Sequence, residues 1–379
     1  MKKNLIIFGT RPEAIKMAPL FKEFLEHKNN FETKLCITAQ HREMLDQVLS
    51  FFEITPDFDL DLMKPNQNLY SLTASIITNL KPILEEFKPD YVYVHGDTTT
   101  TMAASLAAFY SGAKVCHVEA GLRTFNKRSP FPEEINRSVT GRLSDYHFSP
   151  TETSKKNLVN ENVKEESILV TGNTVIDALQ FSTHKVNSLN YIDTEAESLK
   201  QIIDKAKKLI LVTGHRRENH GQGFINICSA LKQIALENPD SQIIYPVHLN
   251  PNVQKPVYEL LDGITNVDLI NPLSYPAFVW LMSQSYLIIT DSGGVQEEAP
   301  SLGKPVLVMR DTTERPEAVD AGTVLLVGTN TKKIVNRATN LLKNPESYSK
   351  MSLLHNPYGD GTACKKIVQF INSLEIINE

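Results

Sequence analysis

The sequence lacks the features that mark zinc-binding, disulfide-rich and membrane-spanning proteins. Its 379 residues include only four cysteines, which are far apart and form no Cys-x-x-Cys pair: Cys36, Cys116, Cys228 and Cys364. This spacing argues against a zinc site or a disulfide framework and favours reduced thiols in a core. No apolar run approaches the ~20 residues that a membrane-spanning helix needs. We therefore expect no metal, no disulfide and no membrane partner.

The charge and the first residues disfavour two further classes of protein. The formal net charge is -5, whereas a protein that binds a nucleic-acid backbone normally carries a basic face, so we expect no nucleic-acid partner. The stretch MKKNLIIFGT has an apolar run of only Leu5–Phe8 before Arg11 and Glu13. That run is too short for the apolar region of a secretory signal, which predicts a cytoplasmic protein.

Two nucleotide-binding fingerprints are also missing. The sequence contains neither Gly-x-Gly-x-x-Gly nor a Walker A motif. Reactions that need a bound dinucleotide or a phosphate-transferring P-loop are therefore disfavoured. We expect a protein that works without a cofactor.

What the chain does contain is a regular alternation of short apolar runs and amphipathic stretches. In the first half the runs are NLIIF, KLCIT, YVYV and KVCHV, and in the second half they are KLILVT, QIIYPV, VDLI, YLIIT and PVLVM. After NLIIF, the residues Ala14, Ala18, Phe21 and Leu25 recur at helical spacing. Strand–helix alternation of this kind is typical of parallel sheets covered by helices on both faces. It predicts an α/β protein with two doubly wound, Rossmann-like domains facing a cleft.

The domain limits follow from where the pattern stops and restarts. We predict an N-terminal domain over residues 1–180, a C-terminal domain over 181–360, and a helix over 361–379 that packs back on the first domain. The stretch NSLNYIDTEAESLKQIIDKAKK between the halves is polar and poorly patterned for a sheet. We interpret it as a linker followed by a solvated helix.

Carboxylates follow two strands of the first half. Asp97 comes after YVYVHG and Glu119 after KVCHV, so both belong at the carboxyl edge of a parallel sheet, where ligands bind. Asp97 alternatively caps the next helix, but Thr100 stands where a capping box favours Glu or Gln, which favours a functional role. In SPFPEEINR, Glu133 and Glu134 follow Pro132 at a helix start, where they serve either chemistry or the helix dipole.

Basic and glycine-rich stretches suggest where an anion binds. The loop FGTRPEAIK offers Arg11 and Lys16 near a helix start, as anion contacts or as solvated charge. In TGHRREN, His215 lies between glycine and two arginines at a strand end. The stretch TDSGGVQEE places the backbone N–H groups of Ser292–Gly294 at a helix start, which suits a diphosphate. Glu297 or Glu298 would then reach ribose hydroxyls, and Arg310 and Arg315 lie beside this site.

Several of these stretches together resemble one family. The stretches are FGTRPEAIKMAPL, TAQHREMLDQVL, HGDTTTT, HVEAGLRT, PEEINR, TGNTVIDAL, TGHRREN, YPVHLNPNV, TDSGGVQEEAPSLGKPVLVMRDTTERPEA and HNPYGDG. They closely resemble the bacterial non-hydrolysing UDP-N-acetylglucosamine 2-epimerases, and the resemblance covers nearly the whole chain. It implies a glycosyltransferase-B type of fold, a homodimer, and interconversion of UDP-GlcNAc and UDP-ManNAc for cell-surface polysaccharide.

The resemblance also implies roles for individual residues. The catalytic positions of the family fall on Asp97, Glu119, Glu133 and His215. The resemblance implies that the N-terminal domain carries the catalytic carboxylates and that the C-terminal domain binds UDP. The nucleotide-sugar contacts fall on Arg11, Lys16, Leu273, Phe278, Ser292, Gly293, Gly294, Glu298 and Arg315. Leu273 replaces the Gln of some relatives, so that only a backbone contact would be preserved there. Gln40 and His248 match an allosteric second substrate site, whereas KPNQN around Asn66 lacks the Arg of some regulated relatives.

The chemistry explains why an acid cluster is needed. No carbonyl lies next to C2 of the sugar, so its proton is not removed by simple enolisation, and no dinucleotide fingerprint supports oxidation. Elimination of UDP to a 2-acetamidoglucal, followed by re-addition, needs acid and base groups on both faces of C2. A glycosyltransferase of the same fold, a non-catalytic nucleotide-sugar sensor and a hydrolysing epimerase remain as alternatives.

Overall fold

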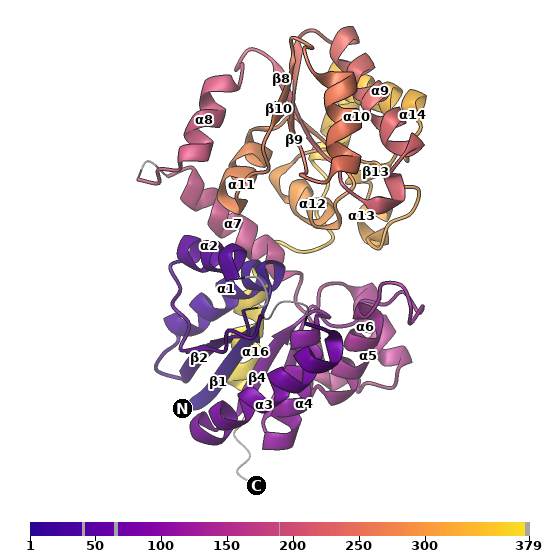
Figure 1. Ribbon diagram of the computed structural model, residues 1–379. Coiled ribbons are helices and arrows are strands. Elements are labelled where there is room, and N and C mark those ends of the chain that lie inside the picture. The colour runs from indigo at the N-terminus through magenta and orange to yellow at the C-terminus, as the bar shows by residue number, and fades with distance from the viewer. Residues whose placement is uncertain (40–41, 64–66, 189, 376–379) are drawn as a thin grey trace. The chain divides into compact units, whose positions relative to one another are not determined.

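The computed structural model describes residues 1–39, 42–63, 67–188 and 190–375. The chain forms two compact units (Figure 1). The first comprises Met1–Ala178 with Tyr358–Glu379, and the second comprises Leu179–Pro357. The boundaries between the units therefore lie after Ala178 and after Pro357. The sequence predicted them after residues 180 and 360.

The first unit is built on a parallel sheet of seven strands in the order β3-β2-β1-β4-β5-β6-β7. The strands are β1 Lys2–Phe8, β2 Phe31–Ile37, β3 Phe58–Asp59, β4 Tyr91–His95, β5 Lys114–Val118, β6 Tyr146–Ser149 and β7 Ile168–Val170. The order reverses between β1 and β4. In such sheets ligands bind at the carboxyl ends of the strands beside this reversal.

Helices cover both faces of this sheet. They are α1 Arg11–Glu26, α2 Arg42–Phe52, α3 Leu69–Phe87, α4 Thr99–Ser111, α5 Glu133–Leu143, α6 Glu152–Asn160, the first part of α7 Thr174–Val186, and α16 Ala363–Ser373, with the 3-10 turn η1 Glu165–Ser167. Apolar side chains of β1, β4, α3 and α4 form one continuous core cluster. The predicted fold class is confirmed for this half of the chain.

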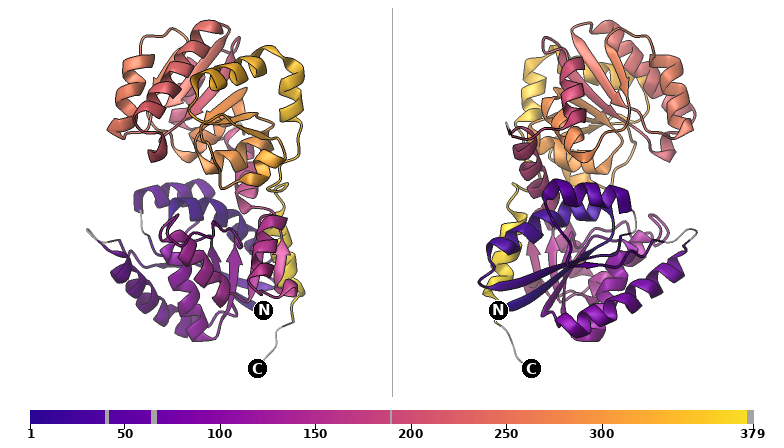
Figure 2. Two further views of the ribbon diagram at one scale, coloured as in Figure 1. Left: turned by 90° about the vertical axis from the view of Figure 1, so that its right-hand side faces the viewer. Right: turned by 60° about the vertical axis from the view of Figure 1, so that its left-hand side comes forward.

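The C-terminal helix α16 belongs to the first unit, where it packs on α1. Phe370 of α16 lies edge-on against Tyr146 and Phe148 of β6, with ring centroids 5.6 and 5.9 Å apart. The ammonium of Lys2 in β1 donates to the carbonyl of Leu374 at 2.6 Å, which stabilises the end of the helix. Both views of Figure 2 show α16, in yellow, against this unit. Both ends of the chain are therefore held in the same unit.

The second unit contains six parallel strands in the order β10-β9-β8-β11-β12-β13. The strands are β8 Lys208–Thr213, β9 Ser241–Pro246, β10 Val267–Ile270, β11 Leu287–Thr290, β12 Val306–Val308 and β13 Val324–Leu326. Its helices are the end of α7, α8 Thr194–Ile202, α9 Gln222–Glu237, α10 Pro251–Leu261, α11 Tyr275–Gln284, α12 Gly293–Glu298, α13 Pro316–Asp320, α14 Thr331–Lys343 and α15 Pro345–Ser352, with the turns η2 Arg217–Asn219 and η3 Ala299–Leu302. The strand order reverses between β8 and β11, as it does between β1 and β4.

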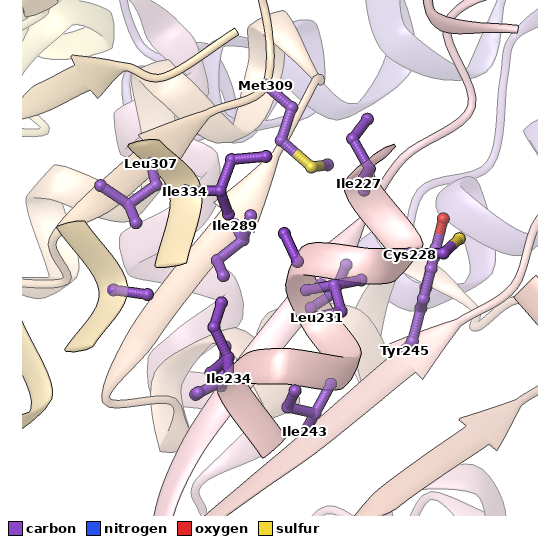
Figure 3. Packing of buried hydrophobic residues seen from close by; sticks show 14 of the residues in the cluster. Ile227, Cys228, Leu231, Ile234, Ile243, Tyr245, Ile289, Leu307, Met309 and Ile334 are labelled. Atoms are coloured by element: carbon purple, nitrogen blue, oxygen red, sulfur yellow. The ribbon is translucent and has the colours of Figure 1, made fainter. Parts of the chain in front are cut away.

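The core of the second unit lies between α9 and the sheet. Figure 3 shows Ile227, Leu231 and Ile234 of α9 packed over Ile243 and Tyr245 of β9. These positions on α9 recur at three and four residues, which is the spacing of one helix face, and all five side chains are fully buried. The packing fixes the strands whose ends carry the candidate site of this unit.

The segment between the halves forms the helix expected from the sequence. This helix is α8, and most of its residues are exposed, while Ala196 and Leu199 are buried and pack toward α11. Glu195 accepts from the backbone N–H of Ser274 at 2.9 Å, and the Lys200 ammonium lies 5.8 Å from the centroid of the Trp280 ring. Within the described residues, no helix combines the length and the hydropathy required to cross a bilayer.

Candidate active site

The carboxyl ends of β4 and β5 bring Asp97 and Glu119 to one edge of the first sheet. The two strands stay paired to their ends, because the N–H of Gly96 donates to the carbonyl of Val118 at 2.9 Å. The ring Nε2 of His117 donates to the carbonyl of Gly96 at 2.7 Å. Burial lowers the pKa of His117 to about 3, so this imidazole is neutral. The neutral His117 ring and the backbone bond of Gly96 therefore fix the two strand ends that carry Asp97 and Glu119.

Asp97 does not cap a helix. That role falls to Thr98, whose hydroxyl accepts from the N–H of Thr101 at 3.1 Å. The carboxylate of Asp97 instead accepts from Nη2 of Arg137 at 2.5 Å. Burial nevertheless raises the pKa of Asp97, Arg137 opposes the rise, and the charges of Glu119 and Glu133 add to it. The three acids named from the sequence are thus close enough to influence one another.

Glu119 lies in the opposite electrostatic situation. Its backbone is in the left-handed region, with φ of 61°, which a non-glycine residue adopts only where the surroundings hold it. Its Oε2 accepts from the ammonium of Lys16 and from Nδ2 of Asn173 at 2.9 Å, with Nε2 of His95 at 3.6 Å. Burial acts to raise the pKa of Glu119, but Lys16 and His95 together hold it well below its usual range. Glu119 is therefore an anion at neutral pH.

Glu133 and Glu134 separate into two roles at the start of α5. The carboxylate of Glu134 accepts from the backbone N–H groups of Thr124 at 3.0 Å and Phe125 at 2.8 Å, which anchors the preceding loop. Oε2 of Glu133 is buried and accepts no hydrogen bond from any described residue. An unsatisfied buried acceptor is costly, so this oxygen is suited to a donor that arrives with a ligand.

Sequence reasoning missed a fourth acid, Glu13. Its carboxylate accepts from Thr10 Oγ1 at 2.8 Å and from the hydroxyls of Thr98 at 2.7 Å and Thr101 at 3.2 Å. It thereby joins the turn after β1 to the turn after β4. The spacing of Thr10 and Glu13 is that of a capping box. This local signal would have predicted the contact of Glu13 with Thr10, but not its contacts with Thr98 and Thr101.

The two basic residues of the first loop behave differently. The ammonium of Lys16 forms an ion pair with the carboxylate of Glu119. Arg11 is the first residue of α1 and is exposed. Arg137 and Asn173, which contact Asp97 and Glu119, were not singled out from the sequence, because nothing in their neighbourhoods indicates which distant acid they meet.

In the second unit, a buried aspartate organises the loop after β8. Asp291, which follows β11, accepts from the backbone N–H groups of His215 at 2.9 Å and Arg216 at 2.8 Å. The His215 ring stacks on His248, with centroids 5.1 Å apart and planes at 14°. Its side chain is 45% exposed, yet burial lowers its pKa, against the effect of Asp291. His215 is therefore held in place by its backbone while its ring stays accessible.

The turn after β11 carries the other predicted contacts of this unit. Ser292 is the N-cap of α12, and Gly293 and Gly294 begin the helix. The Arg315 guanidinium lies 3.3 Å from where a Cβ on Gly293 would be, and its Nε donates to Glu297 at 2.8 Å. Any side chain at 293 would push this guanidinium away. Glu298 faces the same turn, with Oε2 3.8 Å from the Cβ position of Gly294.

The remaining predicted residues are placed as follows. Leu273 and Phe278 are half-buried, just before and within α11. Arg310 follows β12 and forms an ion pair with Glu218, with Nε and Oε1 2.6 Å apart. His248 contacts His215, whereas Gln40 and Asn66 lie outside the described residues. Across the described ranges, no three histidine, cysteine or carboxylate side chains gather as a metal site would require.

Comparison with known proteins gives one family. The profile of the UDP-N-acetylglucosamine 2-epimerase family matches residues 23–372. The UDP-N-acetylglucosamine 2-epimerases of Escherichia coli K12 and Yersinia pestis are 60% and 59% identical to this chain over 374 residues, covering 99% of each protein. The crystal structure of the Neisseria meningitidis UDP-GlcNAc 2-epimerase bound to UDP-GlcNAc matches with a TM-score of 0.88 at 56% identity, over 97% of this chain and 99% of that one. With clustered acids at one strand reversal, a glycine turn at the other and these matches over nearly its whole length, the chain belongs to the UDP-N-acetylglucosamine 2-epimerase family.

Proposed function

We propose that this protein interconverts UDP-GlcNAc and UDP-ManNAc without hydrolysing either. The base removes the C2 proton while the C1–O bond breaks, which leaves UDP and a 2-acetamidoglucal. Protonation of C2 on the opposite face and re-addition of UDP at C1 complete the inversion. The family assignment and the UDP-GlcNAc-bound Neisseria relative support this substrate.

The observation that carries the proposal is the opposite shift of the pKa values of two clustered acids, Asp97 and Glu119. Asp97 has a raised pKa and Glu133 has a buried, unsatisfied oxygen, so both are suited to proton transfer at C2. Glu119 is held as an anion by Lys16, which suits it to positioning or to stabilising positive charge. Neighbouring acids whose pKa values are pushed apart can take different roles in one reaction.

The second unit supplies the groups for the leaving UDP. We propose the backbone N–H groups of Gly293 and Gly294, the Arg315 guanidinium and the His215 ring as donors to a diphosphate. The N–H of Ser292 donates to Oγ1 of Thr290 at 2.9 Å and so holds the turn itself. Arg11, Leu273, Phe278 and Glu298 are proposed as further contacts of the nucleotide sugar.

One experiment separates this function from its rivals. The protein is incubated with UDP-GlcNAc in D₂O, without metal or acceptor, and followed by proton NMR. We expect UDP-ManNAc, with deuterium at C2 in both epimers. Free ManNAc as the main product would indicate a hydrolysing epimerase, unlabelled UDP-GlcNAc would indicate a sensor or a transferase, and either result would overturn the proposal.

We also propose that the protein is a homodimer. Phe109 and Tyr110 at the end of α4 are 59% and 69% exposed, and Ile135 and Val139 of the adjoining α5 are 44% and 39% exposed. Such a group of apolar side chains suits a protein interface. Light scattering should give twice the chain mass for the wild type and the single mass for Phe109→Glu with Tyr110→Glu. A monomeric wild type would refute the dimer.

Two further expectations stay predictions. His248 is proposed as part of a second substrate site, for which sigmoidal dependence of the initial rate on UDP-GlcNAc would be the observable sign. A hyperbolic dependence would count against it. The cytoplasmic location expected from the sequence likewise remains a prediction.

A further inference from the structure

Asn173 contacts the carboxylate of Glu119 and lies where two segments of the chain cross, one that leads out of the first unit and one that returns to it. It follows β7 and is 3% exposed. Its Nδ2 donates to Oε2 of Glu119 at 2.9 Å, and its Oδ1 accepts from the N–H of Val175 at 3.0 Å. The side-chain amide is thus used at both ends, which fixes its orientation.

The backbone of Asn173 is fixed by the chain that returns to this unit. Its N–H donates to the carbonyl of Tyr358 at 2.7 Å. The chain leaves the first unit after Ala178 and re-enters at Tyr358, so Asn173 touches the returning segment at its first residue. The outgoing and returning segments are therefore joined by the same residue that holds Glu119.

Two glycines permit this close crossing. Gly172 has φ of 90°, and a Cβ there would lie 3.0 Å from the carbonyl oxygen of Tyr358. Gly359 has φ of 113°, and a Cβ there would lie 3.2 Å from Cα of Gly172 and 3.8 Å from the backbone N of Asn173. A side chain at either position would strain the backbone and separate the two segments. That separation would carry the amide of Asn173 away from Glu119.

We propose that Asn173 is a positioning residue for Glu119, and that the returning chain at Tyr358 and Gly359 sets its position. The proposal rests on the proposed function for its kinetic consequences. A displacement of the returning segment then reaches the reacting centre through one amide group. The atoms nearest to a Cβ at either glycine belong to the crossing segments, so we expect the effect of a side chain there on turnover to pass through Asn173.

The first test removes the amide. Asn173→Ala should lower kcat by about 10²-fold, the cost typical of a misplaced catalytic group, and leave KM nearly unchanged. The lost donor favoured the ionised carboxylate, so the acid limb of kcat/KM should move to higher pH. Asp177→Asn is the matched control. Asp177 lies in α7 and accepts from the backbone N–H groups of Ala363 at 3.2 Å and Cys364 at 2.9 Å, at the start of α16. It should lower the unfolding midpoint without moving the acid limb.

The second test asks whether the glycine acts through the amide. Gly359→Ala should lower kcat in the same direction, and adding Asn173→Ala to it should cause little further loss. Equal and independent losses in this double-mutant cycle would overturn the role of the returning chain.

A titration of the Glu119 carboxyl keeps the two proposals separable. With ¹³C-labelled glutamate and Glu119→Gln to assign the signal, the midpoint should be higher in Asn173→Ala than in the wild type. An unmoved midpoint would overturn the positioning role whether or not the enzyme is active. A wild type that forms no UDP-ManNAc would instead overturn the proposed function.

Discussion

The two units place an aspartate after corresponding strands and use it in different ways. Asp97 follows β4 and Asp291 follows β11, the strands beside the reversal in each sheet. Asp291 is fully buried and accepts from two backbone N–H groups of the loop that carries His215. The carboxylate of Asp97 accepts from a side-chain donor, the Arg137 guanidinium, at 2.5 Å, and burial raises its pKa beside two other acids. The sheet topology decides where a residue lies, whereas its hydrogen-bond partners decide whether it is structural or available for chemistry.

The same contrast extends to the surrounding charges. In the first unit, Lys16 and Arg137 each pair with a carboxylate that we assign to the reaction. In the second unit, backbone N–H groups and Arg315 surround a turn that offers positive potential. We propose that one unit provides proton transfer and the other provides anion binding, and substitutions in each unit test this division.

The largest effect is expected for Asp97→Asn. Removing a group that transfers a proton should lower kcat by about 10²–10⁴-fold. The affinity for UDP, measured by calorimetry, should stay close to that of the wild type, because its proposed contacts lie mainly in the other unit. Asp46→Asn, on the exposed face of α2, is the control and should be fully active. Near-normal turnover of Asp97→Asn would remove Asp97 from the mechanism.

A smaller effect, on binding, is expected for Arg315→Lys. Lysine keeps the charge but loses the planar fork that binds a diphosphate through two donors. Loss of a charge-assisted hydrogen bond of about 1.5–3 kcal/mol corresponds to roughly 10–100-fold weaker UDP binding. Arg337→Lys, on the exposed face of α14, should bind UDP normally. Unchanged UDP affinity in Arg315→Lys would break the division of tasks.

The stability of the protein should also reveal the raised pKa of Asp97. A folded-state pKa above the unfolded one means that the folded protein holds the proton more tightly. The free energy of unfolding therefore falls as the pH rises from about 3.9, the usual aspartate value, through the raised pKa. Asp97→Asn lacks this loss, so its stability relative to the wild type should increase across that window. Urea unfolding at several pH values measures the difference, and a constant difference would contradict the assigned direction.

The smallest effect is expected for Leu273→Gln. If the nucleotide contacts this position through the backbone, the side chain should change UDP affinity by less than about 0.5 kcal/mol, or about twofold. Phe278→Ala, measured in parallel, should show a clear loss of UDP affinity, because the substitution removes an aromatic ring that we propose as a contact. A tenfold gain of affinity in Leu273→Gln would show that the side chain at 273 does contact the ligand.

The longer elements of the fold could be predicted because their burial pattern is local. NLIIF, YVYV and KLILVT are apolar runs long enough to identify buried strands, and β1, β4 and β8 contain them. The strands β3, β7 and β13 have only two or three residues, which is too short for any periodicity. The strand β6, YHFS, places the buried His147 beside Phe148, so its sequence does not read as apolar. Their places are fixed by neighbouring strands rather than by their own composition.

The candidate site divides in the same way. The carboxylates could be anticipated because each follows a recognisable strand, and the family resemblance assigned their roles. Their partners Arg137 and Asn173 lie 40 and 54 residues further along the chain, and only the folded sheet brings them there. The opposite pKa shifts of Asp97 and Glu119 depend on those partners. The sequence therefore indicated which acids lie together at the sheet edge but not in which direction the pKa of each is shifted.

The return of α16 to the first unit has a consequence for how the chain is made. Because residues 179–357 are inserted between two parts of the first unit, they are synthesised in full before the ribosome has produced the helix that completes it. Domains generally fold as units as they emerge, so the inserted one is expected to mature first. The acid-bearing unit, which begins at Met1, would then wait with its α1 surface uncovered until the last residues are released. Limited proteolysis of a fragment comprising residues 1–357, which lacks α16, should find the insert protected and the N-terminal part still cleavable.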